Sequence, residues 1–355
     1  MEGDGTGWYE LEAEPLAGLA GSALLAAAAL AAIYVALVAA VAGATGASYI
    51  MFPELGALAY DVFGRPRGRW SNAPVHLATT PVITGALGIA ITRVLPYGFL
   101  SVLLSVSGAM AVIMALGSPI APAISAGLLP LVLGVRSWGY PPGIMFGTVL
   151  LAAASVPWRA VMVQPGDAVV HSAPATPPGL LWAAAYFAFV VAAVAMVKLT
   201  GLRFILFPPL AVIGFEMFGH LESCAWAGYP LRLPLVCFLT AAGGLALHHL
   251  LGVTWMTAAL SMAWGMAVLQ VFRVHVPPAL AVALLPMVME APTAWYPCSV
   301  GLGTLTLTLW FRCCRGSLQG GQIRPTAVCS LRLGSEKREV TDASGRQERG
   351  NCTLS

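Results

Sequence analysis

Two stretches of this chain carry the same residue pattern at a nearly constant separation, and both lie in apolar sequence. Residues 52–64 match residues 207–219 at an offset of 155, and from residue 74 onward the offset is 156. The matched pairs include Pro53 with Pro208, Asp61 with Glu216, Thr84 with Thr240, Gly88 with Gly244, Pro122 with Pro278, and Leu128-Leu129-Pro130 with Leu284-Leu285-Pro286. One single-residue shift over about ninety positions is not expected of unrelated apolar segments. The pattern therefore predicts a duplicated unit.

The composition places this unit in a membrane. Hydrophobic residues make up 58 % of the chain and charged residues 9 %, far from the composition of soluble domains. A helix needs about 20 apolar residues to cross the hydrocarbon layer, and residues 19–45 and 179–197 supply such runs without a charge. Only helices and closed barrels satisfy their backbone groups in lipid, and the alternating ten-residue strands of a barrel are absent from the sequence.

We therefore predict an all-α, polytopic transmembrane protein built from two tandem repeats. In each repeat we expect six apolar segments, the second and the fifth being short and interrupted by proline. The predicted parts are an acidic N-terminal segment at 1–18, membrane repeat 1 at 19–157, a linker at 158–178, membrane repeat 2 at 179–312 and a disordered basic tail at 313–355.

The short segments are the first candidates for a functional site. Proline removes a backbone donor and disturbs the helix around it, which at membrane depth requires cover by protein or by a water-filled cavity. Short, proline-interrupted segments at matching places in two halves indicate a transport site, and we expect their N-termini to offer unpaired N–H groups to an anion. The alternative is that proline only marks helix ends near the headgroups. The candidate residues are Pro53, Pro119, Pro122, Pro208, Pro277 and Pro278.

The segment His275-Val276-Pro277-Pro278-Ala279, followed by Ala283-Leu284-Leu285-Pro286, resembles the HPP family of integral membrane proteins. The block Phe63-Gly64-Arg65-Pro66-Arg67 leading to Pro74-Val75-His76-Leu77 is similar to the same family. Some relatives in that family are implicated in nitrite transport, so the resemblance implies a small multi-span protein that moves a small anion. The His-Pro-Pro tripeptide departs from the family pattern here, because Val276 separates His275 from Pro277 and Pro119 stands at the position matching His275.

Ionisable residues inside the apolar sequence are the second group of candidates. Asp61 and Glu216 are matched carboxylates, and such a group at membrane depth favours its neutral form and could carry a proton. The alternative for Asp61 is an interfacial position with an ion pair to Arg65 or Arg67. Glu54 is set aside, because Pro209 stands at the matching position.

Two pairs of matched cationic positions, Arg93 with His249 and His76 with Arg232, could attract a small anion. The alternative is that these side chains extend to the headgroups. Arg93 and His249 are the positions proposed for substrate binding, together with His275 at the start of the fifth segment of repeat 2.

Several classes of site are not predicted. Adjacent His248 and His249 point about 100° apart on a helix and lack further ligands at suitable spacing, so no metal is expected. No cofactor and no nucleic-acid partner is expected either. The sequence contains no GxSxG, HExxH, P-loop or dinucleotide-binding pattern, so we expect no enzyme.

The function predicted from these observations is transport of a small solute, such as the anion nitrite, through the interface between the two repeats. The partners expected are the lipid bilayer and that solute, and a homo-oligomer is possible. Two alternatives stay open: a membrane-embedded enzyme acting on a lipid substrate, and a scaffold that transports nothing. The expected location is the plasma (inner) membrane. The basic tail indicates a cytoplasmic C-terminus and permits the acidic N-terminus outside, which would need an odd number of crossings.

Overall fold

The computed structural model describes residues 21–164, 179–219, 224 and 226–321. Within these residues the chain is helical and contains no strand. The first half, residues 21–162, has the order α2 (Gly21–Thr45), η1 (Ser48–Ile50), α3 (Glu54–Gly64), α4 (Pro74–Val94), α5 (Phe99–Ala115), α6 (Ala123–Leu133) and α7 (Tyr140–Met162). The second half, residues 180–321, has α8 (Leu180–Thr200), η2 (Arg203–Leu206), α9 (Pro208–Gly219), α10 (Arg232–Leu251), α11 (Trp255–Phe272), α12 (Pro278–Leu284), η3 (Leu285–Val288) and α13 (Tyr296–Gly321).

Six of these helices are long and apolar enough to cross a membrane: α2, α4, α7, α8, α10 and α11. Large apolar side chains lie exposed on their outer surfaces, including Leu25, Ile33 and Leu37 on α2. Exposed apolar residues along long helices are expected where lipid, rather than water, surrounds the protein. The predicted class is confirmed: this is an all-α, polytopic integral membrane protein.

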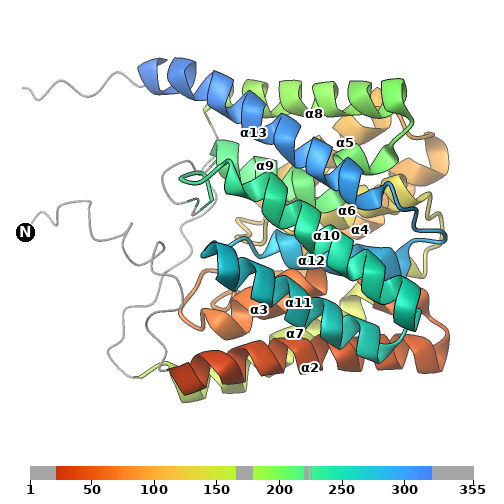
Figure 1. Ribbon diagram of the computed structural model, residues 1–355, viewed down its shortest axis with the longest axis vertical. Coiled ribbons are helices and arrows are strands. Elements are labelled where there is room, and N and C mark those ends of the chain that lie inside the picture. Colours follow the sequence, from red (N-terminus) through yellow and green to blue (C-terminus); the bar gives the residue numbers. More distant parts are fainter. Residues whose placement is uncertain (1–20, 165–178, 220–223, 225, 322–355) are drawn as a thin grey trace, which may run out of the picture.

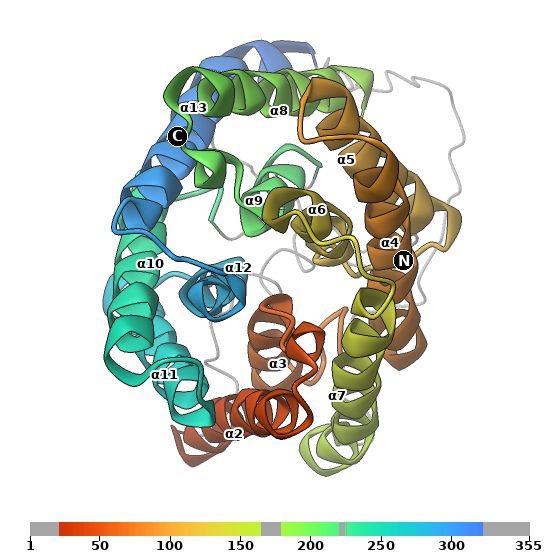
Figure 2. The ribbon, with the colours of Figure 1, turned by 90° about the vertical axis from the view of Figure 1, so that its right-hand side faces the viewer.

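Long and short helices occupy different places. Figure 2 shows α3, α6, α9 and α12 in the middle, with the other labelled helices in a ring around them. The central helices have 11, 11, 12 and 7 residues. All residues of α3 and of α12 are buried. The two halves meet in this centre, because α3 packs against α12 and α6 packs against α9. In the ring, the halves meet where α2 contacts α11 and α5 contacts α8.

Contacts recur at the sequence offset of 156. The Tyr140 hydroxyl donates to the Ala126 carbonyl at 3.0 Å, and the Tyr296 hydroxyl donates to the Val282 carbonyl at 2.6 Å. These bonds attach the start of α7 to α6 and the start of α13 to α12. The helices and hydrogen bonds of the two halves therefore occur at the residue pairs that match in the sequence. That the halves arose by duplication stays a prediction.

Glycine sets the distance between the long and the short helices. A Cβ at Gly88 on α4 would lie 2.1 Å from the Gly127 carbonyl oxygen of α6, and a Cβ at Gly244 on α10 would lie 2.0 Å from the Ala283 carbonyl oxygen of α12. Small residues allow such close approach of helix backbones. The close approach at these two glycines positions α6 and α12 in the centre.

Both halves run in the same direction across the structure. In Figure 1, α2 and α8 both begin on the left side, and α7 and α13 both end there. The start of α2 and the end of α13 consequently lie on one face. The described part of the chain therefore begins and ends on one face, while the acidic and basic ends, whose charges permit opposite sides, lie outside the described residues.

Two segment boundaries differ from the prediction. Helix α7 continues through Pro157 to Met162, so the first residues of the expected linker are helical. Helix α13 continues through Arg312 to Gly321, beyond the boundary expected at 312. The apolar pattern ends before either helix does, because a helix needs no apolar residues where it leaves the membrane. The expected acidic segment, most of the linker and the rest of the tail lie outside the described residues.

Candidate functional site

Two acidic side chains lie inside the protein on the short helix α3. Glu54 and Asp61 are each 1 % exposed. They stand seven residues apart, which is two helical turns and about 10 Å along the helix. Since residues at this spacing share one helix face, α3 presents two carboxyl groups at two depths of the protein centre.

Glu54 is the first residue of α3, directly after Pro53. Its Oε1 accepts a hydrogen bond from the hydroxyl of Ser125 on α6. Its Oε2 is buried and has no hydrogen-bond partner in the structure. A buried carboxyl oxygen without a partner is costly if the group is charged, so this end of α3 is a place where a ligand or a proton would be stabilised.

The first turn of α3 is closely packed against the second half. A Cβ at Gly56, two residues after Glu54, would lie 2.5 Å from Cδ1 of Leu284 on α12 and 2.9 Å from Sδ of Met262 on α11. Apolar side chains from the second half therefore press directly on the start of α3. The Glu54–Ser125 pair itself joins two central helices of the first half, and both side chains are buried away from bulk water.

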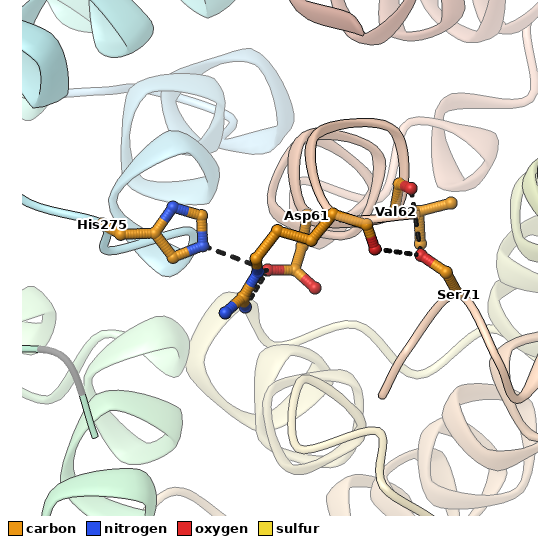
Figure 3. Close-up of polar contacts among 5 residues, drawn as sticks. Asp61, Val62, Ser71 and His275 are labelled. Carbon is orange, nitrogen blue, oxygen red and sulfur yellow. Dashed lines mark hydrogen bonds and ion pairs between the residues drawn. The ribbon is translucent and has the colours of Figure 1, made fainter. Parts of the chain in front are cut away.

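Asp61 forms the second polar group, which joins the two halves (Figure 3). Its Oδ1 accepts a bond from Nε of Arg65 at 2.8 Å and lies 3.1 Å from Nε2 of His275. His275 stands in the segment between α11 and α12, and its ring stacks on Tyr60 with centroids 5.3 Å apart. The expected ion pair of Asp61 with Arg65 is present, and the contact with His275 adds a link from α3 to the second half.

The end of α3 is held in place by a serine. The Ser71 hydroxyl lies 3.0 Å from the Val62 carbonyl oxygen and 2.8 Å from the Arg65 carbonyl oxygen (Figure 3). Ser71 is fully buried. This bonding orients the turn that carries Arg65, whose side chain remains 30 % exposed while it contacts Asp61.

The prolines occupy the starts of the central helices, as predicted. Pro53 and Pro122 cap α3 and α6, Pro208 is the first residue of α9, and Pro277 and Pro278 begin α12. All five are buried, whereas Pro119 is half-buried and precedes α6. The proline-broken segments are therefore short helices packed in the protein centre.

The expectation of free N–H groups at these helix starts is wrong where the structure describes them. The N–H of Leu55 donates to the Phe52 carbonyl at 2.9 Å, and the N–H of Leu210 donates to the Phe207 carbonyl at 2.9 Å. At α12, the N–H of Ala279 donates to the Val276 carbonyl at 3.0 Å. A tight turn before each helix uses these donors, which sequence inspection cannot foresee.

The matched cations do not converge on one site. Arg93 is exposed at the end of α4 and donates to the Arg136 carbonyl at 3.1 Å. His249 is exposed in the last turn of α10. Figure 2 shows α4 and α10 on opposite sides of the ring, so the two side chains do not form one anion clamp.

The second matched pair has a structural role. His76 contacts the Leu116 carbonyl at 3.1 Å, and Arg232 contacts the Phe272 carbonyl at 3.2 Å. Each of these bonds links the start of a long helix to the end of the next one, 40 residues further along the chain. This capping explains why a cationic or polar side chain occurs at both positions.

Glu216, the residue matched to Asp61, is half-buried on α9. The position in the first half that matches His275 is Pro119, which has no ionisable side chain. The Asp61–His275 contact thus has no counterpart of the same chemistry in the other half. In the part of the chain that the structure describes, no group of three or more His, Cys, Asp or Glu side chains could hold a metal ion.

Sequence reasoning missed Glu54 and Ser125. The signal was present, since Glu54 is an acidic residue directly after a helix-starting proline in apolar sequence. Glu54 was set aside because Pro209 stands at the matching position of the second half. Comparison of the two halves does not identify a site that is present in only one of them. Ser125 carries no signal, because serine is common in membrane helices.

No family model, no curated protein and no solved structure matches this chain. The fold and the site define the class of protein: a polytopic α-helical membrane protein with buried acidic side chains between its two halves. The resemblance to the HPP family stays a prediction from short motifs.

Proposed function

We propose that the protein transports a small solute across the membrane, along the centre where the two halves meet. The observation that carries this proposal is the group of four short central helices, α3, α6, α9 and α12, among which α3 places the buried acidic side chains of Glu54 and Asp61 between long apolar helices. A purely structural membrane bundle gains nothing from such groups, because burying them costs free energy. Ionisable residues inside a membrane protein commonly mark the pathway of an ion or a substrate.

The contacts between the halves suggest how the pathway opens. Alternating access requires one half to rock against the other, and the pairs α3–α12 and α6–α9 are the central contacts across which this occurs. Opening of the face at which α3 ends would break the bond between Asp61 and His275. The Asp61–His275 contact therefore closes the pathway on this side in the state described.

The substrate class that we propose is a small anion, nitrite being the first candidate. The resemblance to the HPP family supports it. The guanidinium of Arg65 supports it as well, because this group is paired with Asp61 but stays partly exposed at the end of α3, where it can also contact an anion. Arg93 and His249 do not contribute to this proposal. We place the protein in the plasma (inner) membrane, with the ends of the described chain on the cytoplasmic side.

The two other classes of function lead to different outcomes. A membrane-embedded enzyme would consume a lipid substrate when supplied with it in detergent, and the protein is proposed not to do so. A scaffold would show no stabilisation by any solute and would purify with a partner protein. We favour transport over a scaffold because a scaffold needs no acidic side chain between its halves.

Thermal stability in detergent against nitrite, nitrate, formate, bicarbonate and chloride tests the proposal. A ligand at about 100 times its dissociation constant stabilises the folded state by about 2.7 kcal/mol, so a selective and saturable rise in melting temperature is expected for a substrate. Uptake of the same anion into liposomes containing the purified protein then tests transport itself. Absence of both stabilisation and uptake for every anion would exclude the proposed substrate class.

A further inference from the structure

We propose that Glu54 is the site at which this protein binds the proton that drives solute movement. This inference rests on the proposed transport function and identifies its coupling ion. In the cycle, one carboxylate oxygen of Glu54 takes one proton from water on one side, forming an O–H bond. That bond breaks when the site faces the other side, where the proton returns to water. No electrons move in this step.

The environment of the Glu54 carboxyl group disfavours a charge. Glu54 is 1 % exposed, and one of its two oxygens has no hydrogen-bond partner. The Ser125 hydroxyl supplies one bond to the other oxygen. An ionised carboxylate without a counter-charge is strongly disfavoured in such surroundings. A neutral carboxylic acid needs only one acceptor for its O–H group. The conformation in this structure therefore favours the protonated form of Glu54.

Among the described residues, no cation neutralises Glu54. Arg65 stands about three turns away, directly after the end of α3, and contacts Asp61. The ionisable groups that face Glu54 are the phenols of Tyr140 on α7 and Tyr296 on α13, both of which interact with it electrostatically. Each phenol donates its proton to a backbone carbonyl instead. The remaining neighbours described above are apolar, so a proton is what neutralises Glu54.

The surroundings of Glu54 suit a proton better than a metal cation. Protein-bound metal cations take several oxygen ligands. The Glu54 carboxyl group is hydrogen-bonded by the Ser125 hydroxyl and by its own backbone N–H, which has no oxygen to offer a metal. A proton requires one oxygen and no coordination shell, and the free oxygen of Glu54 provides that.

Protonation of Glu54 would also couple the proton to an anion. An anion entering the centre meets repulsion from ionised Glu54 in a medium of low dielectric constant, and protonation removes this repulsion. The anion and the proton would consequently bind together and move in the same direction. With one Glu54 per chain, the expected ratio is one proton for each anion.

Infrared difference spectroscopy of the purified protein tests the proton site without any substrate. A pH titration should show the C=O stretching band of a protonated, buried carboxylic acid, and this band should be missing in Glu54→Gln. Because Ser125 bonds to this group, Ser125→Ala should shift the band, which keeps the test valid if Glu54→Gln fails to fold. Asp61→Asn should leave the band in place. A carboxylic-acid band that is absent from the wild type, or unchanged in both the Gln and the Ala variants, would overturn the proposal.

Liposomes containing the protein, loaded with a pH-sensitive dye, test the coupling. With nitrate outside and an inward proton gradient, the wild type should accumulate nitrate about tenfold for each unit of pH difference and should acidify the interior. Glu54→Gln should lose both responses to the gradient. Nitrate is preferred to nitrite because protonated nitrite crosses bilayers unaided, and protein-free liposomes measure that background.

The outcomes separate the two proposals. If the wild type moves none of the anions, the proposed function fails, while the infrared band still decides whether Glu54 binds a proton. If the wild type transports an anion without moving protons, or if Glu54→Gln retains proton-driven accumulation, the transport function stands and the assignment of Glu54 is wrong.

Discussion

Replacement of Gly88 by alanine should destabilise the protein, although alanine is the better helix former. The added Cβ would lie 2.1 Å from the carbonyl oxygen of Gly127 and 2.9 Å from its carbonyl carbon. These are backbone atoms of α6, so no side-chain rotation can relieve the clash, and α6 would have to move by about 1 Å. Displacement of α6 would also move Ser125, which bonds to Glu54.

The magnitude follows from two opposing terms. Overpacking of a tightly packed core costs about 1–3 kcal/mol, and an immovable backbone neighbour favours the upper end of this range. Exchange of glycine for alanine within a helix returns about 0.5–1 kcal/mol. The expected net loss in the free energy of unfolding is about 2 kcal/mol, with a similar loss for Gly244→Ala, whose Cβ would lie 2.0 Å from a backbone oxygen.

The measurement is reversible unfolding in mixed micelles with increasing denaturing detergent, followed by tryptophan fluorescence. Gly43→Ala is the matched control, since Gly43 is exposed in α2 and a Cβ there would meet nothing within 4 Å. This control should be neutral or slightly more stable. If Gly88→Ala were as stable as the Gly43→Ala control, the close packing of α4 on α6 would be refuted.

Three further perturbations address the site. The double variant Arg93→Ala with His249→Ala should leave anion uptake unchanged at equal expression, because both side chains are exposed at helix ends; a severe loss of uptake would restore the anion clamp. His275→Ala should speed hydrogen exchange of amides in α3, because its bond to Asp61 joins the halves; exchange equal to that of His249→Ala would contradict this. Ser71→Ala should lower the free energy of unfolding by about 1–2 kcal/mol, because two backbone carbonyls lose a buried donor; equal stability in denaturing detergent would show that these bonds contribute little.

Much of the fold could be predicted from the sequence, because its main constraints are local. Apolar length identifies spanning helices, and proline identifies the starts of short ones such as α3 at Pro53 and α6 at Pro122. The ends of α7 and α13 could not be predicted in this way, since both helices continue into polar sequence. The common direction of the two halves depends on how each short segment turns, which the composition does not determine.

The candidate site was only partly predictable, for a physical reason. Asp61 and His275 were singled out separately as ionisable groups in apolar sequence, but they are 214 residues apart, and only packing of α3 against α12 brings them together. Arg93 and His249 were selected by the same criterion and lie exposed at helix ends. A sequence shows which side chains would be costly to bury, and the fold decides which of them are buried.

The two halves share their helices but differ in the polar groups at the centre. Glu54 and Ser125 of the first half correspond to Pro209 and Ala281 of the second, so the hydrogen-bonded pair occurs once. Matching helices require matching glycines and prolines, because these residues set helix starts and packing distances. A proton-binding site does not have to be repeated, and a second buried carboxylate beside the first would make it harder to ionise either one. The asymmetry at Glu54 is therefore a reason to expect a coupling site there, and matched positions reveal the scaffold that holds it.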